Sequence, residues 1–392
     1  MNEEPARHAN KSFQKGRVFL LSLCHFIHDI YSSFLAPLLP FIVEKFSLNL
    51  TQAGLLTTVT QIPALLNPLI GKLADRVSVR WFIILAPAMT AIPMSLLAIA
   101  PNYVVLLVLL FVAGISVSLF HVPAPVMVYR VSGGKTGRGM SVYMTGGELA
   151  RTLGPLAIIG SVSLLGFDGY YPVMLVGILA SLLMYYKFKD IPITSSSPEK
   201  TSIRRTAREL KSLLLPLSAI VIVRGFMHAS LTAFLPLYIM QETADVWLAG
   251  ISLSLFEAAG VLGILAVGTL SDRFGRRNML LFSLVIAPVS LLTFIIGAEW
   301  LRFPALVVTG FTLLSTTPVM LAMIQETSAD GSSSANGIFM MISFLARSAV
   351  VVVVGFTADH IGLEKTYILS AVLGLLGIPV IFMLPRKKTA AV

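Results

Sequence analysis

Long apolar runs recur along almost the whole chain, and they constrain its fold more than any other feature. Each run is close to the roughly 20 residues that an α-helix needs to cross a bilayer. Charged residues make up only 12% of the chain, against about a quarter of a soluble domain. The sequence therefore predicts an all-α membrane protein with twelve transmembrane helices. The runs lie at roughly 17–43, 52–71, 81–100, 103–129, 140–165, 171–188, 212–239, 247–270, 279–297, 303–325, 337–358 and 364–384.

The basic residues predict how these spans are oriented. An even number of spans places both termini on one side, and loops rich in Lys and Arg stay in the cytoplasm. The N-terminus, the loops on its side and the C-terminal tail hold 23 of the 29 basic residues. We expect an inner-membrane protein with cytoplasmic termini, whose net charge of +10 reflects topology and not nucleic-acid binding. The single cysteine, Cys24, excludes an intrachain disulfide and a cysteine-based metal cluster.

A polar stretch, DIPITSSSPEKTSIRRTARELK, interrupts the apolar pattern at residues 190–211. Its Ser-rich, charged composition is typical of a solvated connector. We interpret it as a cytoplasmic linker between a first bundle, 1–189, and a second, 212–392.

The two predicted bundles repeat each other. GKLADRVSVR at 71–80 returns as GTLSDRFGRR at 268–277, at an offset of 197 residues. Arg151 matches Arg347 at an offset of 196, and His28 matches His228 at an offset of 200. Two related sets of six spans are the plan of a transporter whose site lies between two bundles.

The duplicated Gly-x-Leu-x-Asp-Arg stretch resembles the signature loop of the major facilitator superfamily. The resemblance implies two pseudo-symmetric six-helix bundles (the major facilitator fold) and a loop that braces one bundle against the other. The first copy has Ser78 where the pattern has Gly. The alternative is that the arginines only mark the cytoplasmic side. The gating residues implied are Gly71, Asp75, Arg76, Gly268, Asp272, Arg273, Gly275 and Arg276.

A narrower resemblance is to the fosmidomycin-resistance-like branch, which implies drug efflux by proton antiport. It rests on His25…Asp29, Leu38-Leu39-Pro40-Phe41, Phe120-His121, Pro123, Ser132-Gly133-Gly134-Lys135, Gly146-Gly147 and Leu153-Gly154-Pro155. Two departures concern the proton route. No acid follows His121-Val122-Pro123, and a carboxylate stands instead at Glu148.

Ionisable side chains lie in the middle of several spans. Each costs about 2.5–3.5 kcal/mol at mid-bilayer unless it faces water or a partner. Such residues are therefore candidates for a transport site. They are His25, His28, Asp29, His121, Glu148, Arg151, Arg224, His228, Glu257 and Arg347.

The stretch CHFIHDIY holds three of them. On a helix, His25 and Asp29 lie about 40° apart, and His28 widens the arc to about 100°. Three interpretations remain open: a protonation site, a set of structural hydrogen bonds, or a metal site, which needs a further ligand from elsewhere. We expect no metal, and proton coupling by Asp29 first of all. His25, His28, Glu148 and His121 are the other expected carriers.

The expected substrate site is rich in arginine. Glu148 and Arg151, three residues apart, can pair on one helix face, either as a structural pair or as a switch that frees Arg151 when Glu148 is protonated. With Arg224, His228, Glu257 and Arg347 as further lining residues, the balance of charge favours an anionic or zwitterionic substrate.

Together these features predict a monomeric secondary transporter that moves protons and a small molecule across the bilayer. We expect proton-coupled efflux of a drug-like, amphiphilic or anionic compound; the alternative is a proton-coupled importer or exchanger of an organic anion. No phosphate-binding loop, cofactor site or catalytic constellation is present in the sequence, which weighs against a membrane enzyme. The short tail weighs against a sensor.

Overall fold

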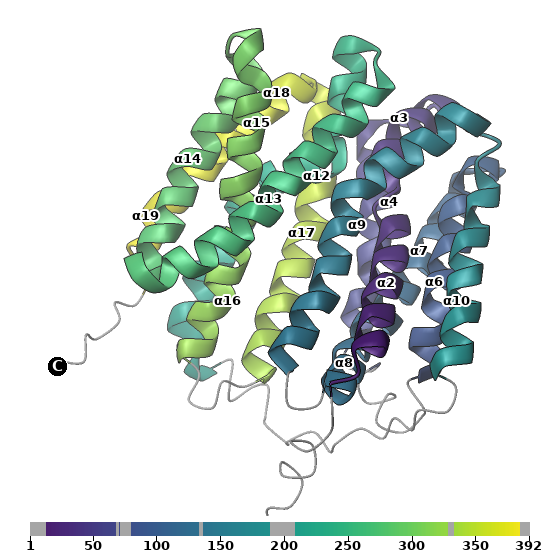
Figure 1. Ribbon diagram of the computed structural model, residues 1–392. Helices are drawn as coiled ribbons and strands as arrows, with labels where there is room; N and C mark the ends of the chain where they lie inside the picture. The colour runs from purple at the N-terminus through teal and green to yellow at the C-terminus, as the bar shows by residue number, and fades with distance from the viewer. Residues whose placement is uncertain are drawn as a thin grey trace, which may run out of the picture. The chain divides into compact units, whose positions relative to one another are not determined.

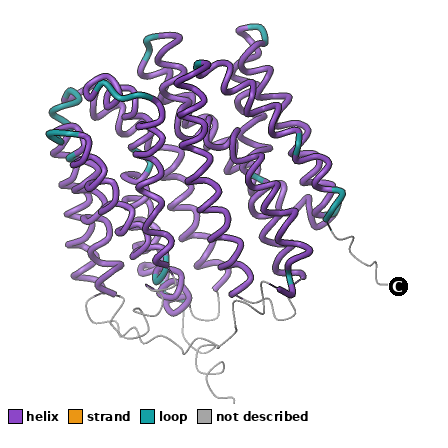
Figure 2. Tube along the Cα trace, turned by 180° about the vertical axis from the view of Figure 1, so that it is seen from behind, coloured by secondary structure: helices purple, strands orange, loops and turns teal. Residues whose placement is uncertain are grey.

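The computed structural model describes residues 13–67, 70, 80–132, 136–188, 208–327 and 333–384. Within these ranges Figure 2 shows helices and loops and no strand. Eleven helices are long and apolar enough to cross a membrane, and they correspond to eleven of the twelve predicted spans. The remaining span, 52–71, begins with α4 (Leu50–Gln61) and η1 (Ile62–Leu66), and its end lies outside the described residues.

The chain divides into two compact units. Unit 1 contains Met1–Leu48 and Val59–Pro198, and unit 2 contains Asn49–Thr58 and Glu199–Val392. Most of the predicted linker, 190–207, lies outside the described residues. The segment 49–58 belongs to unit 2, although the sequence predicted that it lies in the first bundle, 1–189.

Unit 1 is built around a long first span. This span consists of α2 (Lys15–Ser32) and α3 (Leu35–Phe46), and α2 packs against α9 (Thr136–Leu165) and α6 (Arg80–Ser95). α6 in turn contacts α7 (Tyr103–His121) and α10 (Met174–Phe188), as Figure 1 shows. Where α2, α6, α7 and α9 meet, buried apolar side chains, among them Leu21, Ile83, Phe120 and Tyr143, form a core.

Unit 2 is arranged around α12 (Lys211–Thr243). This helix contacts α13 (Val246–Phe274), α17 (Ser333–Ile361) and α18 (Leu363–Leu375). α14 (Arg276–Ile296) packs against α15 (Glu299–Leu314) and α18 (Figure 1). Short helices α16 (Thr316–Thr327) and α19 (Gly377–Ile381) complete the unit, whose core includes Leu217, Leu280, Met320 and Phe339.

Several predicted spans are interrupted, and in each unit one such break lies at or beside a predicted site residue. In unit 1, α7 ends at His121 and α8 (Ala124–Ser132) follows. Pro123 has no N–H to continue the helical ladder. In unit 2, α15 ends at Leu314 and α16 begins at Thr316. There the hydroxyls of Ser315 and Thr316 donate back to the carbonyls of Thr312 and Leu313, at 2.8 Å each, and such bonds bend helices.

The first residues of α4 are attached to α17 within unit 2. The Asp359 carboxylate accepts hydrogen bonds from the backbone N–H of Leu50 at 2.6 Å and of Thr51 at 2.9 Å. The Thr51 hydroxyl donates to the same carboxylate at 2.5 Å. The first N–H groups of a helix have no partner within it, so Asp359 acts as a cap supplied from a distant helix.

Candidate functional site

Several buried polar side chains of unit 1 meet in the Asp29 cluster, which we define as His25, His28, Asp29 and the partly exposed His121. Asp29 lies on α2 and is 4% exposed. His28 Nδ1 donates to its Oδ1 at 2.8 Å. His121 Nε2, at the end of α7, lies 3.1 Å from the same oxygen. His25 Nε2 lies 3.2 Å from Oδ2. One carboxylate thus has three imidazole neighbours. The helical arc of the sequence placed two of them, His25 and His28, on the side of Asp29, and the structure adds His121.

The orientation of His25 is fixed by α9. Its Nδ1 is 2.9 Å from the backbone carbonyl of Tyr143. Its ring stacks on the Tyr143 ring with centroids 4.1 Å apart. Gly147 leaves room for the imidazole, because a Cβ at that position would come within 2.5 Å of the ring. The Gly146-Gly147 pair, noted in the sequence only as a family feature, therefore has a packing role beside His25.

The Tyr143 carbonyl determines which nitrogen of His25 carries hydrogen. A carbonyl oxygen only accepts hydrogen bonds, so the Nδ1 atom of His25 carries the proton that it donates. In neutral His25 the Nε2 lone pair then faces the Asp29 carboxylate. Two electron-rich buried atoms at 3.2 Å repel each other, and a cation between them removes that repulsion. The geometry therefore suits one exchangeable cation shared by His25 and Asp29.

His121 connects the Asp29 cluster to the surface of unit 1. Its side chain is 38% exposed, whereas those of His25, His28 and Asp29 are nearly fully buried. Its place at the end of α7, before Pro123, brings its ring beside those of His25 and His28, with centroids 5.2 and 5.5 Å away. His121 is thus the exposed member of the cluster, from which a cation can enter or leave.

Glu148 forms an ion pair within its own helix, α9. Arg151 donates to it at 3.1 Å across one turn of α9, as their spacing predicts. Arg151 is the more exposed partner, with 48% of its side chain accessible against 19% for Glu148.

Among the described side chains of unit 2 the most buried charge is Arg224 on α12, at 5% exposed. Its guanidinium donates to the Leu313 carbonyl at 3.2 Å and to the Thr317 hydroxyl at 2.8 Å, on either side of the break between α15 and α16. The Nε atom is buried and has no hydrogen-bond acceptor within the described part of the chain. Within the described residues no carboxylate forms an ion pair with Arg224, and its charge is close enough to that of Arg347 for the two to repel.

The other predicted substrate residues of unit 2 are half-buried. His228 Nδ1 is 3.4 Å from the Thr232 hydroxyl, one turn further along α12. The Arg347 guanidinium lies 5.9 Å from the centroid of the Phe344 ring on α17. Glu257 lies on α13.

The chain matches a known family along nearly its whole length. The family model described as Major Facilitator Superfamily matches residues 21–245 and again 217–392. The chain belongs to the major facilitator superfamily. It is therefore a multi-pass membrane protein of a transporter family, as the duplicated loop predicted.

Two relatives of this major facilitator protein carry names that refer to drug resistance. The chain is 26% identical to the fosmidomycin resistance protein of Escherichia coli (strain K12), over 93% of this chain and 91% of that protein. It is 26% identical to the multidrug resistance protein MdtG of Salmonella paratyphi C, over 66% and 68% of the two chains. The predicted resemblance to the fosmidomycin-resistance-like branch is thus confirmed as a similarity.

Two solved structures share the fold of this major facilitator protein. A bacterial homologue of the human lysosomal transporter Spinster superimposes with a TM-score of 0.81 at 16% identity, over 95% of this chain and 97% of that chain. The nucleoside transporter NupG superimposes with a TM-score of 0.75 at 14% identity, over 94% of this chain and 99% of that chain.

The signature loop is described only in its second copy. Gly71, Asp75 and Arg76 lie outside the described residues, and of Gly268 and Asp272 only the backbone, within α13, is described. Gly275 alone links α13 to α14, with φ of 88°, a conformation that favours glycine. Arg276 donates back to the buried Ser271 hydroxyl of α13, while Arg273 lies over the Phe274 ring at 5.6 Å.

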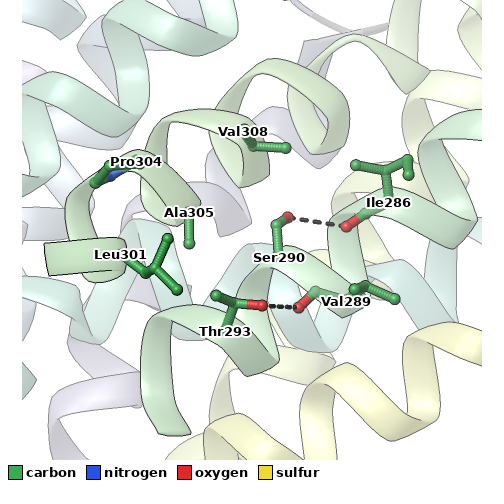
Figure 3. Close-up of a pocket in the computed structure, with 8 residues that line it drawn as sticks. All are labelled: Ile286, Val289, Ser290, Thr293, Leu301, Pro304, Ala305 and Val308. Atoms are coloured by element: carbon green, nitrogen blue, oxygen red, sulfur yellow. Dashed lines mark hydrogen bonds between the residues drawn. The ribbon is translucent and has the colours of Figure 1, made fainter. Parts of the chain in front are cut away.

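A hollow of about 320 Å³ lies between α14 and α15, and Figure 3 shows its lining. The wall is mostly apolar, with Ser290 and Thr293 donating to carbonyls of their own helix. It contains none of the predicted site residues, so we do not assign it as the transport site. Its lining residues are Ile286, Val289, Ser290, Thr293, Leu301, Pro304, Ala305 and Val308.

Proposed function

We propose that this transporter couples proton movement to the efflux of a drug-like, amphiphilic or anionic small molecule by antiport. The protein exposes its site to each side of the membrane in turn. We propose that it acts as a monomer in the inner (cytoplasmic) membrane. The distribution of its basic residues supports cytoplasmic termini.

The Asp29 cluster carries this proposal. A carboxylate buried among three imidazoles, with the His25 lone pair turned toward it, suits the binding of one proton. Imidazole is the side chain that titrates closest to neutral pH. We assign Asp29 and His25 as the proton-sharing pair, His121 as the entry point and His28 as the residue that holds Asp29 in place.

The substrate side of the proposal rests on Arg224. A buried guanidinium with no acidic partner among the described residues supports an anionic group on the substrate. We propose that His228, Glu257 and Arg347 contribute to the same site. Protonation of Glu148 would free Arg151 for the substrate. The names of the relatives, which refer to fosmidomycin and multidrug resistance, favour the efflux direction.

We further propose that the signature loop acts as a gating brace. The one-residue Gly275 linker and the Arg276–Ser271 hydrogen bond hold α13 and α14 together at this point, which supports a rigid corner in the second copy. The proposed gating set is Gly71, Asp75, Arg76, Gly268, Asp272, Arg273, Gly275 and Arg276.

The direction of coupling is tested in liposomes that contain the purified protein, a pH-sensitive dye and the substrate, with fosmidomycin as the first probe. Substrate then leaves down its own gradient. Antiport brings protons in and acidifies the lumen, whatever the orientation of the protein. Protein-free liposomes control for passive leakage. An alkaline change would show co-transport and overturn the efflux proposal; substrate release without any pH change would overturn proton coupling itself.

The alternative is a proton-coupled importer or exchanger of an organic anion, and Arg224 is the observation that favours it. A thermal-shift panel of organic anions and hydrophobic cations tests the charge of the ligand. We expect stabilisation by anions in the parent protein and its loss in Arg224→Met, which keeps the aliphatic stem. Stabilisation by hydrophobic cations alone would contradict an anionic substrate in either direction.

A further inference from the structure

We propose that the Asp29 cluster binds a divalent transition-metal ion, best suited to Zn²⁺, through His25 Nε2, His121 Nε2 and the Asp29 carboxylate. These three ligand atoms all lie within 4.8 Å of one another. From the sequence we expected no metal, because no further metal ligand was identified to join His25 and Asp29 of α2. The structure supplies it from α7.

The distances within this site fit a small ion. Zinc bonds of about 2.0–2.2 Å in tetrahedral geometry place neighbouring ligand atoms roughly 3.3–3.6 Å apart. His25 Nε2 and His121 Nε2 already lie 3.2 and 3.1 Å from the two Asp29 oxygens. Both nitrogens therefore lie close to ligand spacing from the carboxylate, and all three ligand atoms lie within 4.8 Å of one another.

The surrounding groups present the ligands in the form that a metal requires. A metal-bound histidine usually donates its other N–H to a carbonyl or carboxylate, which fixes the ring. His25 does this with its Nδ1 and the Tyr143 carbonyl. His28 Nδ1 donates to Asp29 at 2.8 Å and so steadies the carboxylate. Among the described residues, the buried His25 Nε2 forms no hydrogen bond and faces the Asp29 carboxylate.

The donor set selects the class of ion. Two imidazole nitrogens and one carboxylate suit Zn²⁺ and neighbouring transition metals, whereas Ca²⁺ and Mg²⁺ take oxygen ligands. Three protein ligands leave a fourth position of a tetrahedral ion for water or an anionic group. The half-exposed His121 side chain marks the side from which that position is reached.

The test is metal binding by the purified full-length protein in detergent, stripped with chelator and carrying no histidine tag. Zn²⁺ is titrated by calorimetry, and Co²⁺ is titrated by its visible absorption, which reports coordination number. We expect one equivalent of Zn²⁺ per chain, a four-coordinate Co²⁺ spectrum and no saturable binding of Mg²⁺.

Variants locate the site. His121→Ala and Asp29→Asn are expected to weaken Zn²⁺ binding by at least about tenfold, while His360→Ala, which lies in unit 2, leaves it unchanged. Because the His121 side chain is half-exposed, we expect its substitution to disturb the fold least. An unchanged elution profile and melting temperature of His121→Ala check this expectation. Absence of saturable binding, or binding that survives both cluster substitutions, would overturn the proposal. Metal binding is measured without transport. A failure to bind Zn²⁺ is therefore distinguishable from a failure of the proposed proton-coupled transport.

Discussion

Asp29 is tolerable inside a membrane protein because of the atoms that immediately surround it. An isolated charge at mid-bilayer costs about 2.5–3.5 kcal/mol, and hydrogen bonds from imidazoles offset part of that cost. The hydrogen bond from His28 at 2.8 Å and the close approach of His121 at 3.1 Å do this. His25 differs, because its donor is used by the Tyr143 carbonyl. In the proposed function, this difference makes the His25–Asp29 contact the place where a cation is gained and lost.

Gly147→Ala tests the packing behind His25. The added Cβ would lie within 2.5 Å of the imidazole, so the ring must leave its present position beside Asp29. We expect a loss of about 1–3 kcal/mol in stability, typical of overpacking, together with impaired proton coupling. Thermal unfolding and the liposome dye assay measure the two effects. Gly225→Ala, where the nearest atoms are 3.7 Å or more away, is the control and should unfold at or above the parent temperature.

Thr317→Val tests the support of Arg224. The change removes the acceptor of the 2.8 Å hydrogen bond and leaves a buried guanidinium N–H without a partner, at a cost of about 1–3 kcal/mol. We expect a lower melting temperature, which an anionic ligand partly restores. Thr357→Val removes a hydroxyl that bonds only within its own helix and is the control. Equal melting of both variants would show that Thr317 does not support Arg224.

Sequence reasoning identified the acidic and imidazole groups of the site but not their partners. The helical arc of CHFIHDIY is enough to predict that His25 and Asp29 share a face. The Tyr143 carbonyl and the Thr317 hydroxyl were missed, because a backbone acceptor leaves no mark on residue type and the run Ser315-Thr316-Thr317 does not indicate which distant side chain it contacts. The Gly146-Gly147 pair was the available signal for close helix packing at His25.

At the scale of the helices, breaks within predicted spans position the polar groups of the candidate site. His121 ends α7 beside the Asp29 cluster, and Arg224 contacts both sides of the break between α15 and α16. A helix end leaves carbonyls without intrahelical partners, so a break creates polar acceptors in an apolar setting. The runs 103–129 and 303–325 were predicted as continuous spans because each is apolar over most of its length, although polar residues, His121 and Ser315-Thr316-Thr317, stand at the two breaks. Pro123 was the signal in the first case.

Asp359→Ala tests the cap that α17 places on α4. Loss of the carboxylate removes the acceptor for the N–H groups of Leu50 and Thr51, and losing such a cap costs about 1 kcal/mol. We expect faster hydrogen exchange in a peptide covering residues 49–56. His360→Ala, whose imidazole contacts a carbonyl of its own helix, should not change that exchange; similar exchange in both variants and the parent would exclude a capping role.

For the whole molecule, the sequence was sufficient to predict the class and most of the spans. Apolar length determines a transmembrane helix almost alone, and eleven of the twelve predicted spans correspond to suitable helices in the described residues. The repeat predicted two halves. The grouping of residues 49–58 with unit 2 was not predictable, because it depends on a tertiary contact with Asp359 and not on composition.

The central claim is that Asp29 exchanges the coupled proton, and Asp29→Asn in liposomes tests it most directly. We predict that the variant still exchanges labelled substrate across the membrane without a gradient, but no longer accumulates it when the lumen is made acidic. Asp168→Asn, a change in an exposed carboxylate paired with Lys45, should accumulate substrate like the parent. Accumulation by Asp29→Asn at the parent level would contradict the claim.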